Sequence, residues 1–230
     1  MYINVTVGNG GPTPSQRVKA GETYILPIAN YTSANFGETR IYIYGFSGIS
    51  EIGNLASMYP YSFTLNALDH LKKLDMGTDA SGYVNANLTS LPFTIDTELP
   101  LLESINIKNC HSLSGGLNLN RANNLRTVEA TGTTITGISL PQYTNIETLH
   151  LPSTVTDLVL YGAHRLTDLQ IINNNTGVID YSGLFNLNIY DSDYSSNIDW
   201  LNIAEGIIEK ESTETNLSLL RLSTATITDI

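Results

Sequence analysis

Glu129 and His150 are the residues whose types and spacing come closest to acid–base chemistry. They occupy equivalent positions in neighbouring copies of a short repeated phrase, with Thr127 and Thr148 alongside. A carboxylate beside an imidazole can pass protons, but catalysis needs a concave pocket that excludes water. An open ladder of strands provides no such pocket. The sequence therefore predicts a protein that is not an enzyme and needs no cofactor.

Metal-ligand patterns give little support to a metal site. None of the histidines, His70, His111, His150 and His164, lies in an H-x-H or H-E-x-x-H motif, and the chain has one cysteine. This spacing predicts no zinc site. A calcium site is the alternative in one acidic stretch, which lacks the glycine and final glutamate of an EF-hand loop. Its candidate ligands are Asp191, Asp193 and Asn197.

A short sequence motif, the phrase that is repeated along the chain, predicts the strands that would position these residues. Each copy is aliphatic at its first, fourth and sixth positions, which is the L-x-x-L-x-L signature of a leucine-rich repeat. The alternation within each copy has a period of two, as a half-buried strand requires. Clear copies begin at Leu102, Leu125, Ile146 and Leu166, and related phrases begin at Leu71, Leu184 and Leu217.

A second set of aliphatic pulses lies between these copies. The pulses fall at residues 117–119, 138–140, 158–160 and 179–181. The steps from copy to pulse make one full turn about 21 residues long, which is too short for a repeat with a helix on its back face. We predict a β-rich, leucine-rich-repeat-like solenoid of about seven turns. Strands are expected on its front and back faces, with one late helix.

The ninth position of each clear copy holds a small polar or thiol side chain. Buried backbone donors and acceptors need partners where the chain leaves a strand. These side chains are therefore predicted to bond the backbone at that point. They are Cys110, Thr133, Thr154 and Asn174.

Polar side chains between the aliphatic positions of the front strands are predicted to point outward and to stack into columns. Val128, Leu149 and Leu169 are expected to face the interior. A hydrogen-bonding stripe with little aromatic content could bind a protein or a glycan, and the alternative is an ordinary solvated sheet face. The middle column, which is the candidate binding site, consists of Asp75, Asn106, Glu129, His150, Gln170, Asn188 and Arg221.

Residues 1–60 are predicted to form an N-terminal β cap and its connection to the array. Strands are expected at 2–7, 23–28 and 40–44, and a short helix within 48–58. Such a cap would shield the apolar end of the first turn from water.

Residues 61–230 are predicted to form the solenoid. An inserted loop is expected at 77–91, where two copies are separated by about ten more residues than one turn needs. Apolar residues at helical spacing predict a helix at about 198–210. The last four residues, 227–230, match the start of a back strand, so the chain is expected to end in mid-repeat.

The charge of the chain limits its partners. There are 11 Lys and Arg residues against 22 Asp and Glu residues, and the formal net charge is −11. Such a surface argues against binding to nucleic acid or to anionic membranes. No run of 18 apolar residues occurs, so no membrane insertion is expected. Cys110 is expected to be a packed structural thiol rather than a nucleophile.

One longer pattern gives a family resemblance. Residues 146–152 read I-E-T-L-H-L-P, and V-T-D-L follows at 155–158. This stretch resembles the leucine-rich-repeat proteins of tailed bacteriophages that infect gut bacteria, in which L-x-x-L-x-L-P-x-x-[VI]-T-x-L-x-[LI] recurs. The resemblance covers about residues 38–190. The chain is more distantly similar to BspA-like bacterial surface proteins, but it lacks their repeated Ala-Phe-x-x-Cys segment.

The phage resemblance implies a tail-associated virion component that is displayed outside the host cell. Its expected partners are other virion proteins, a host-surface glycan or protein, or further copies of the chain in a homo-oligomer. The resemblance supplies no catalytic residue. The first alternative is a bacterial cell-surface adhesin or scaffold, and a second is a solenoid that degrades glycans.

Overall fold

The computed structural model describes most of the repeat array and several separate strands. The described residues are 2–7, 16–19, 41–44, 49–53, 68–78, 85–93, 96–142, 144–161, 163, 165–179, 186–190 and 221–222. The predicted helix at about 198–210, the calcium candidates Asp191, Asp193 and Asn197, and the chain end at 227–230 lie outside these residues.

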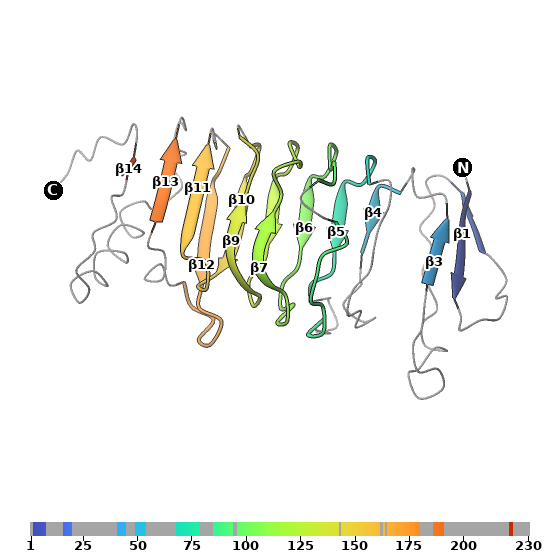
Figure 1. The fold of residues 1–230 in the computed structure, drawn as a ribbon, viewed down its shortest axis with the longest axis horizontal. Helices are drawn as coiled ribbons and strands as arrows, with labels where there is room; N and C mark the ends of the chain where they lie inside the picture. The colour runs from blue at the N-terminus through green and yellow to red at the C-terminus, as the bar shows by residue number, and fades with distance from the viewer. Residues whose placement is uncertain are drawn as a thin grey trace.

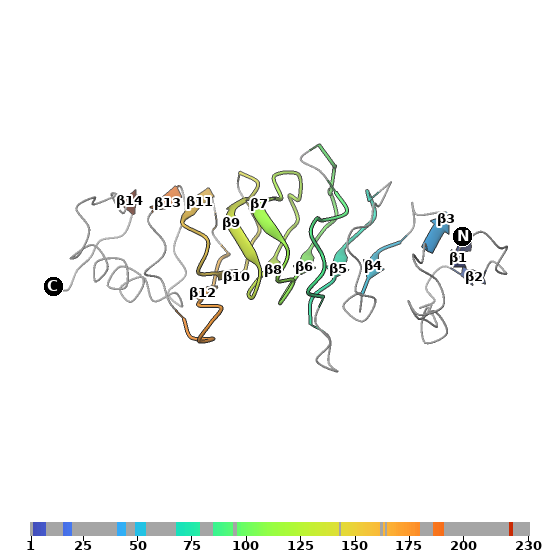
Figure 2. The ribbon, with the colours of Figure 1, turned by 60° about the horizontal axis from the view of Figure 1, so that its bottom comes forward.

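Two parallel sheets form the array, and the strands stand side by side along its length (Figure 1). The front sheet contains β4 (Glu51–Ile52), β5 (Lys73–Asp75), β6 (Ser104–Asn106), β8 (Thr127–Glu129), β10 (Thr148–Pro152) and β12 (Asp168–Ile172). The back sheet contains β7 (Ser114–Asn118), β9 (Thr134–Ser139), β11 (Asp157–Tyr161), β13 (Asn186–Tyr190) and β14 (Arg221–Leu222). Figure 2 shows the two sheets as separate layers.

Strand register confirms the predicted solenoid. Thr127 pairs with Thr148, its equivalent one turn and 21 residues later, and Thr148 pairs with Asp168, which follows it by 20 residues. Backbone bonds between successive turns follow this register, since Arg126 N donates to Glu103 O and Glu147 N donates to Arg126 O, both at 2.8 Å. The described residues make about five turns, where the sequence predicts about seven for the whole chain.

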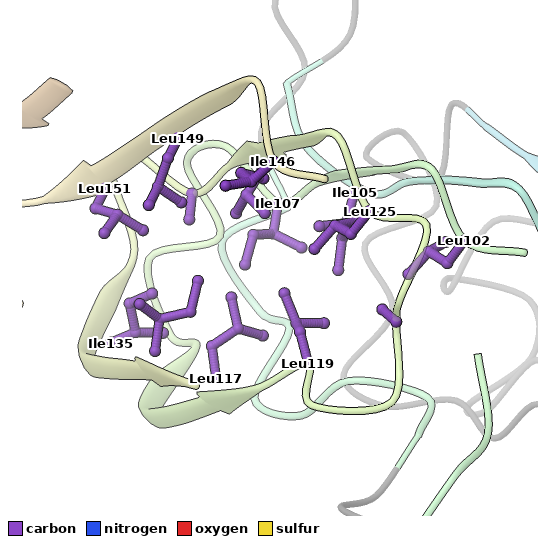
Figure 3. Packing of buried hydrophobic residues seen from close by; sticks show 14 of the residues in the cluster. Leu102, Ile105, Ile107, Leu117, Leu119, Leu125, Ile135, Ile146, Leu149 and Leu151 are labelled. Carbon is purple, nitrogen blue, oxygen red and sulfur yellow. The ribbon is translucent and has the colours of Figure 1, made fainter. Parts of the chain in front are cut away.

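The core is a layer of aliphatic side chains between the two sheets. Val128 and Leu149 are fully buried and Leu169 is 5% exposed, while Glu129 and His150 on the same strands are only half-buried. The predicted inward and outward positions are therefore confirmed. Figure 3 shows front-sheet side chains such as Leu149 pointing into the same core as Leu117 and Ile135 from the back sheet. Full burial of one such side chain contributes roughly 1.5–3 kcal/mol.

Side chains at the ninth position of the repeat bond the backbone, as predicted. Thr133 Oγ1 donates to Ala130 O at 2.8 Å, and Thr154 Oγ1 donates to Ile135 O at 2.6 Å. Asn174 Nδ2 donates to Thr133 O at 2.7 Å, and its Oδ1 accepts from Gly132 N. Cys110 Sγ lies 3.6 Å from Met76 O. Each side chain satisfies a backbone group at a corner of the coil.

The N-terminal strands form their own antiparallel sheet. β1 (Tyr2–Val7) lies between β2 (Gln16–Lys19) and β3 (Ile41–Tyr44). The strands predicted at 2–7 and 40–44 are present, and the one predicted at 23–28 lies outside the described residues. A short helix was expected within 48–58; residues 49–53 instead contain β4, which pairs in parallel with β5 in the front sheet, and the rest of that stretch lies outside the described residues.

Asn188 and Arg221 do not belong to the front column, and this prediction was wrong. β13 pairs with β11, so Asn188 lies opposite Val159 in the back sheet, and Arg221 of β14 pairs with Asn188. The cause is an extra segment after β12, where Ile172 and Ile179 form an antiparallel bridge. It lengthens this half-turn to 18 residues between Leu169 and Leu187, nearly the length of a full turn. The aliphatic pulse at 179–181 was predicted to form a back strand. Ile179 instead forms only the isolated bridge with Ile172 and is 52% exposed.

The stretch predicted as an inserted loop, 77–91, contributes to the core. Leu88 is fully buried, and Asn85 is also buried. The neighbouring strands β5 and β6 still pair directly, because Lys73 lies opposite Ser104. The insertion therefore leaves the front sheet continuous. None of the residues that the structure describes forms a helix long and apolar enough to cross a membrane.

Candidate interaction face

The front column begins with an amide bonded to a carboxylate. Asn106 Nδ2 donates to Asp75 Oδ1 on the preceding turn at 2.9 Å. The other end of the same amide, Asn106 Oδ1, accepts from Lys108 N at 3.0 Å. Because both ends of the amide are held, its orientation on the sheet is defined.

A longer hydrogen-bonded cluster joins the next three front strands. His150 Nδ1 lies 2.9 Å from Glu129 Oε2 of β8, and His150 Nε2 lies 2.8 Å from Asp168 Oδ2 of β12. Gln170 Nε2 donates to Asp168 Oδ1 at 2.9 Å, and Thr131 Oγ1 donates to Glu129 Oε1 at 2.5 Å. The structure thus brings together three predicted column residues, Glu129, His150 and Gln170. Asp168, which pairs with Thr148 and so lies in the adjacent outward-facing column, links them.

The electrostatics of this cluster favour its charged forms. Burial alone would lower the pKa of His150, but hydrogen bonds to Glu129 and Asp168 raise it above 6.5. Burial likewise opposes ionisation of Asp168, but hydrogen bonds from Gln170 and His150 lower the pKa of this carboxyl below 3.8. The ring and the carboxylate therefore stabilise each other in their ionised states.

This geometry differs from that of a catalytic pair. A general base needs one ring nitrogen directed at the group whose proton it takes. In His150 both nitrogens face carboxylates, and neither faces Thr127 or Thr148. The two carboxylates also lie at different ring nitrogens of the imidazole, so the three groups do not point toward one common reacting atom. Within the described ranges, no three His, Cys, Asp or Glu side chains are arranged to hold a metal ion.

A column of hydroxyl groups lies beside the cluster on the same face. Ser104, Thr127 and Thr148 pair with one another across β6, β8 and β10, and all three are half-buried. Their hydroxyls make no hydrogen bond to any other residue that the structure describes. We call these three residues the hydroxyl column. They offer donors and acceptors at the strand-to-strand spacing of a sheet, about 4.8 Å.

A ladder of alternating charge lies on the other side of the hydroxyl column. Lys72 Nζ lies 3.9 Å from Glu103 Oε1, and Arg126 Nη1 lies 3.2 Å from Glu147 Oε1. Arg165 Nη1 also reaches Glu147 Oε1 at 4.0 Å. Sequence reasoning missed this ladder, although the second position of the repeated phrase alternates in sign from Lys72 to Glu147.

Cys110 takes no part in the candidate face. Its side chain is fully buried, and burial, with a smaller contribution from the charge of Asp75, raises the pKa of the thiol to about 12. A thiol that stays protonated is a poor nucleophile. The prediction of a packed structural cysteine is confirmed.

Comparison with known proteins adds no assignment. No family model matches the chain, and no significant match was found among curated proteins or solved structures.

Proposed function

We propose that this chain is a non-enzymatic structural and interaction module that contacts its partner through the front sheet. The observation that carries the proposal is the hydroxyl column of Ser104, Thr127 and Thr148 between two ladders of bonded side chains. Groups that are already ordered lose little conformational entropy on binding. Small hydroxyls in a regular row suit the hydroxyls of a glycan or the backbone of an extended peptide.

The absence of a catalytic role is part of the same proposal. Both nitrogens of His150 are engaged by carboxylates, which supports a structural role for this ring in the sheet. A glycosidase would instead need two carboxyl groups on either side of a scissile bond. Glu129 and Asp168 lie on either side of an imidazole, which occupies that space.

The setting we propose is a phage virion, with the module associated with the tail and displayed outside the host cell. The repeat resemblance over residues 38–190 supports it. Partners would be other virion proteins, a second copy of the chain, or a host-surface glycan or protein. The alternative is a bacterial cell-surface adhesin or scaffold, which the distant similarity in short turns with a back strand supports.

The binding face can be tested with paired surface variants of the full chain. The double variant Thr127→Arg and Thr148→Arg fills the hydroxyl column with two long cations. The control, Thr136→Arg, changes an exposed residue of β9 on the back sheet. We expect binding to intact host bacteria, and to an array of their surface glycans, to fall at least tenfold in the double variant only. Equal binding by both variants would exclude the front face as the surface that binds the host.

The virion setting needs a separate measurement. Particles from a culture that carries the gene would be purified on a density gradient, and their peptides identified by mass spectrometry. We expect this chain to band with the tail proteins. Recovery only from the host envelope would favour the adhesin, and recovery only from the cytoplasm would contradict both settings.

A further inference from the structure

His150 is shared between two carboxylates from different turns of the array. Its Nδ1 and Nε2 lie 2.9 Å from Glu129 Oε2 and 2.8 Å from Asp168 Oδ2. The side chains of His150 and Glu129 are 18% and 22% exposed, so this contact is partly withdrawn from water. The cluster spans β8, β10 and β12, three neighbouring strands of the front sheet.

The number of protons in this cluster follows from its donors and acceptors. A neutral imidazole has one N–H donor and one lone pair, whereas an ionised carboxylate can only accept. With a neutral ring, one of the two short contacts would bring a lone pair against a carboxylate oxygen. With an imidazolium ring, both contacts are charge-assisted hydrogen bonds.

The proton belongs on the ring rather than on a carboxyl group. The remaining oxygen of Glu129 accepts from the hydroxyl and backbone N–H of Thr131, and that of Asp168 accepts from Gln170. Each carboxyl group therefore accepts bonds at both oxygens, which is the pattern of the ionised form.

We propose that Glu129, His150 and Asp168 form a proton-binding site in which an imidazolium ring ties three successive turns together. The array takes up a proton on this ring when the turns stack and releases it when they separate. The bound proton is thus part of the folded structure. The site lies on the same front sheet as the proposed binding face, but its proton binding does not depend on the proposed binding function.

The other charged side chains described around the ring do not change the number of carboxylates that contact it. On the segment leading into β10, Glu147 is engaged by Arg126 before β8 and by Arg165 before β12. Gln170 of β12 and Asn106 of β6 are neutral. Glu129 and Asp168 are therefore the two carboxylates in contact with the ring, one from each adjacent strand.

The direct test is a nitrogen-15 NMR titration of the histidine rings in the full chain. His150 would be assigned by its loss in His150→Gln. We expect its ring to release its proton at a higher pH in the folded protein than in urea. The ring of His111 would be followed in the same spectra for comparison, because its Nδ1 contacts the carbonyl oxygen of Gly132 at 2.7 Å and not a carboxylate. A folded-state midpoint for His150 at or below the midpoint in urea would overturn the proposal.

Matched variants separate the hydrogen bond from general charge. Glu129→Gln removes a carboxylate that contacts the ring, whereas Glu147→Gln removes the same charge from the neighbouring ladder. We expect the midpoint of His150 to fall clearly in Glu129→Gln and to change much less in Glu147→Gln. Equal shifts in the two variants would mean that any nearby negative charge affects the ring of His150 to the same extent. This result would overturn the proposal. The wild-type titration decides the question by itself if a variant does not fold.

Discussion

His150 links the stability of the array to pH through the residues that it contacts. Burial opposes its charge, but hydrogen bonds to Glu129 and Asp168 raise its pKa in the folded state. Its contribution is therefore complete below pH 6.5 and is lost as the pH rises through the raised pKa. The pKa of Asp168 is lowered, so its contribution is present above pH 3.8 and is lost as the pH falls through the lowered value.

From these signs we expect the free energy of unfolding in urea to be highest between pH 3.8 and 6.5, as far as these groups determine it. The alkaline decline should be shallower in His150→Gln, and the acid decline shallower in Asp168→Asn. Unfolding curves at a series of pH values would measure both. An alkaline decline of the same steepness in wild type and His150→Gln would contradict the assignment.

Gly77 is a second residue at which contacts with the neighbouring turn determine how a substitution changes stability. A Cβ atom there would lie 2.6 Å from Lys108 N and would collide with the side-chain amide of Asn106. At Gly137, in β9, no heavy atom lies within 4 Å of an added Cβ. We expect Gly77→Ala to destabilise the protein by about 1–3 kcal/mol, as overpacking does, and Gly137→Ala to change stability by less than about 1 kcal/mol. Thermal melts of the two variants would show the difference.

At the scale of the strand, the charge ladder favours one stacking register over its neighbours. Lys72, Glu103, Arg126 and Glu147 place opposite charges on successive turns. These side chains are each more than 40% exposed, so water and salt screen the pairs. The ladder therefore contributes more to register than to total stability, because like charges opposite each other destabilise a sheet.

Arg126→Glu tests this ladder, because it puts three carboxylates on successive turns. We expect a loss of no more than about 1 kcal/mol at low salt, and a smaller loss in 1 M salt, where the Debye length is about 3 Å. Arg121→Glu is a suitable control, because Arg121 pairs with Glu98 outside the ladder. Melting temperatures at two salt concentrations would be compared. A loss in Arg126→Glu that does not change with salt would indicate altered packing instead.

At the scale of the whole molecule, the array should tolerate the removal of a complete turn better than that of half a turn. Deletion of residues 125–145 removes one 21-residue repeat and leaves Ile146 in the place of Leu125. The inward and outward positions are then unchanged. Deletion of residues 131–141 removes β9 and leaves too few residues to cross the back of the coil. Stability in repeat arrays is approximately a sum over turns and their interfaces.

We therefore expect the 125–145 deletion to unfold cooperatively at a lower temperature than the full chain. The shorter 131–141 deletion should lose the cooperative transition despite removing fewer residues. Circular dichroism during heating would follow both proteins. If the two deletions behaved alike, the turns would not be equivalent units of the fold.

Local alternation in the sequence was sufficient to predict most of the array. Aliphatic and polar residues at a period of two determine which side chains of a strand face inward, as at Leu149 and His150. The repeat length of about 21 residues follows from the distance between equivalent phrases, and the backbone bonds of Thr133 and Asn174 follow from their position after the strand. The alternation and the repeat length depend on residues within one turn, whereas the bonds of Asn174 reach Gly132 and Thr133, 42 and 41 residues earlier in the chain.

Only the tertiary structure decided which sheet the later strands join and which charged groups meet. The pulse at Leu187 and Ile189 suits either face, because burial requires the same alternation in both sheets. The contact of His150 with Asp168 crosses from one outward column to the next, and the repeat pattern predicts only contacts within a column. A hydrophobic period determines which way a side chain points. The partner that it meets depends on how the turns are stacked in space.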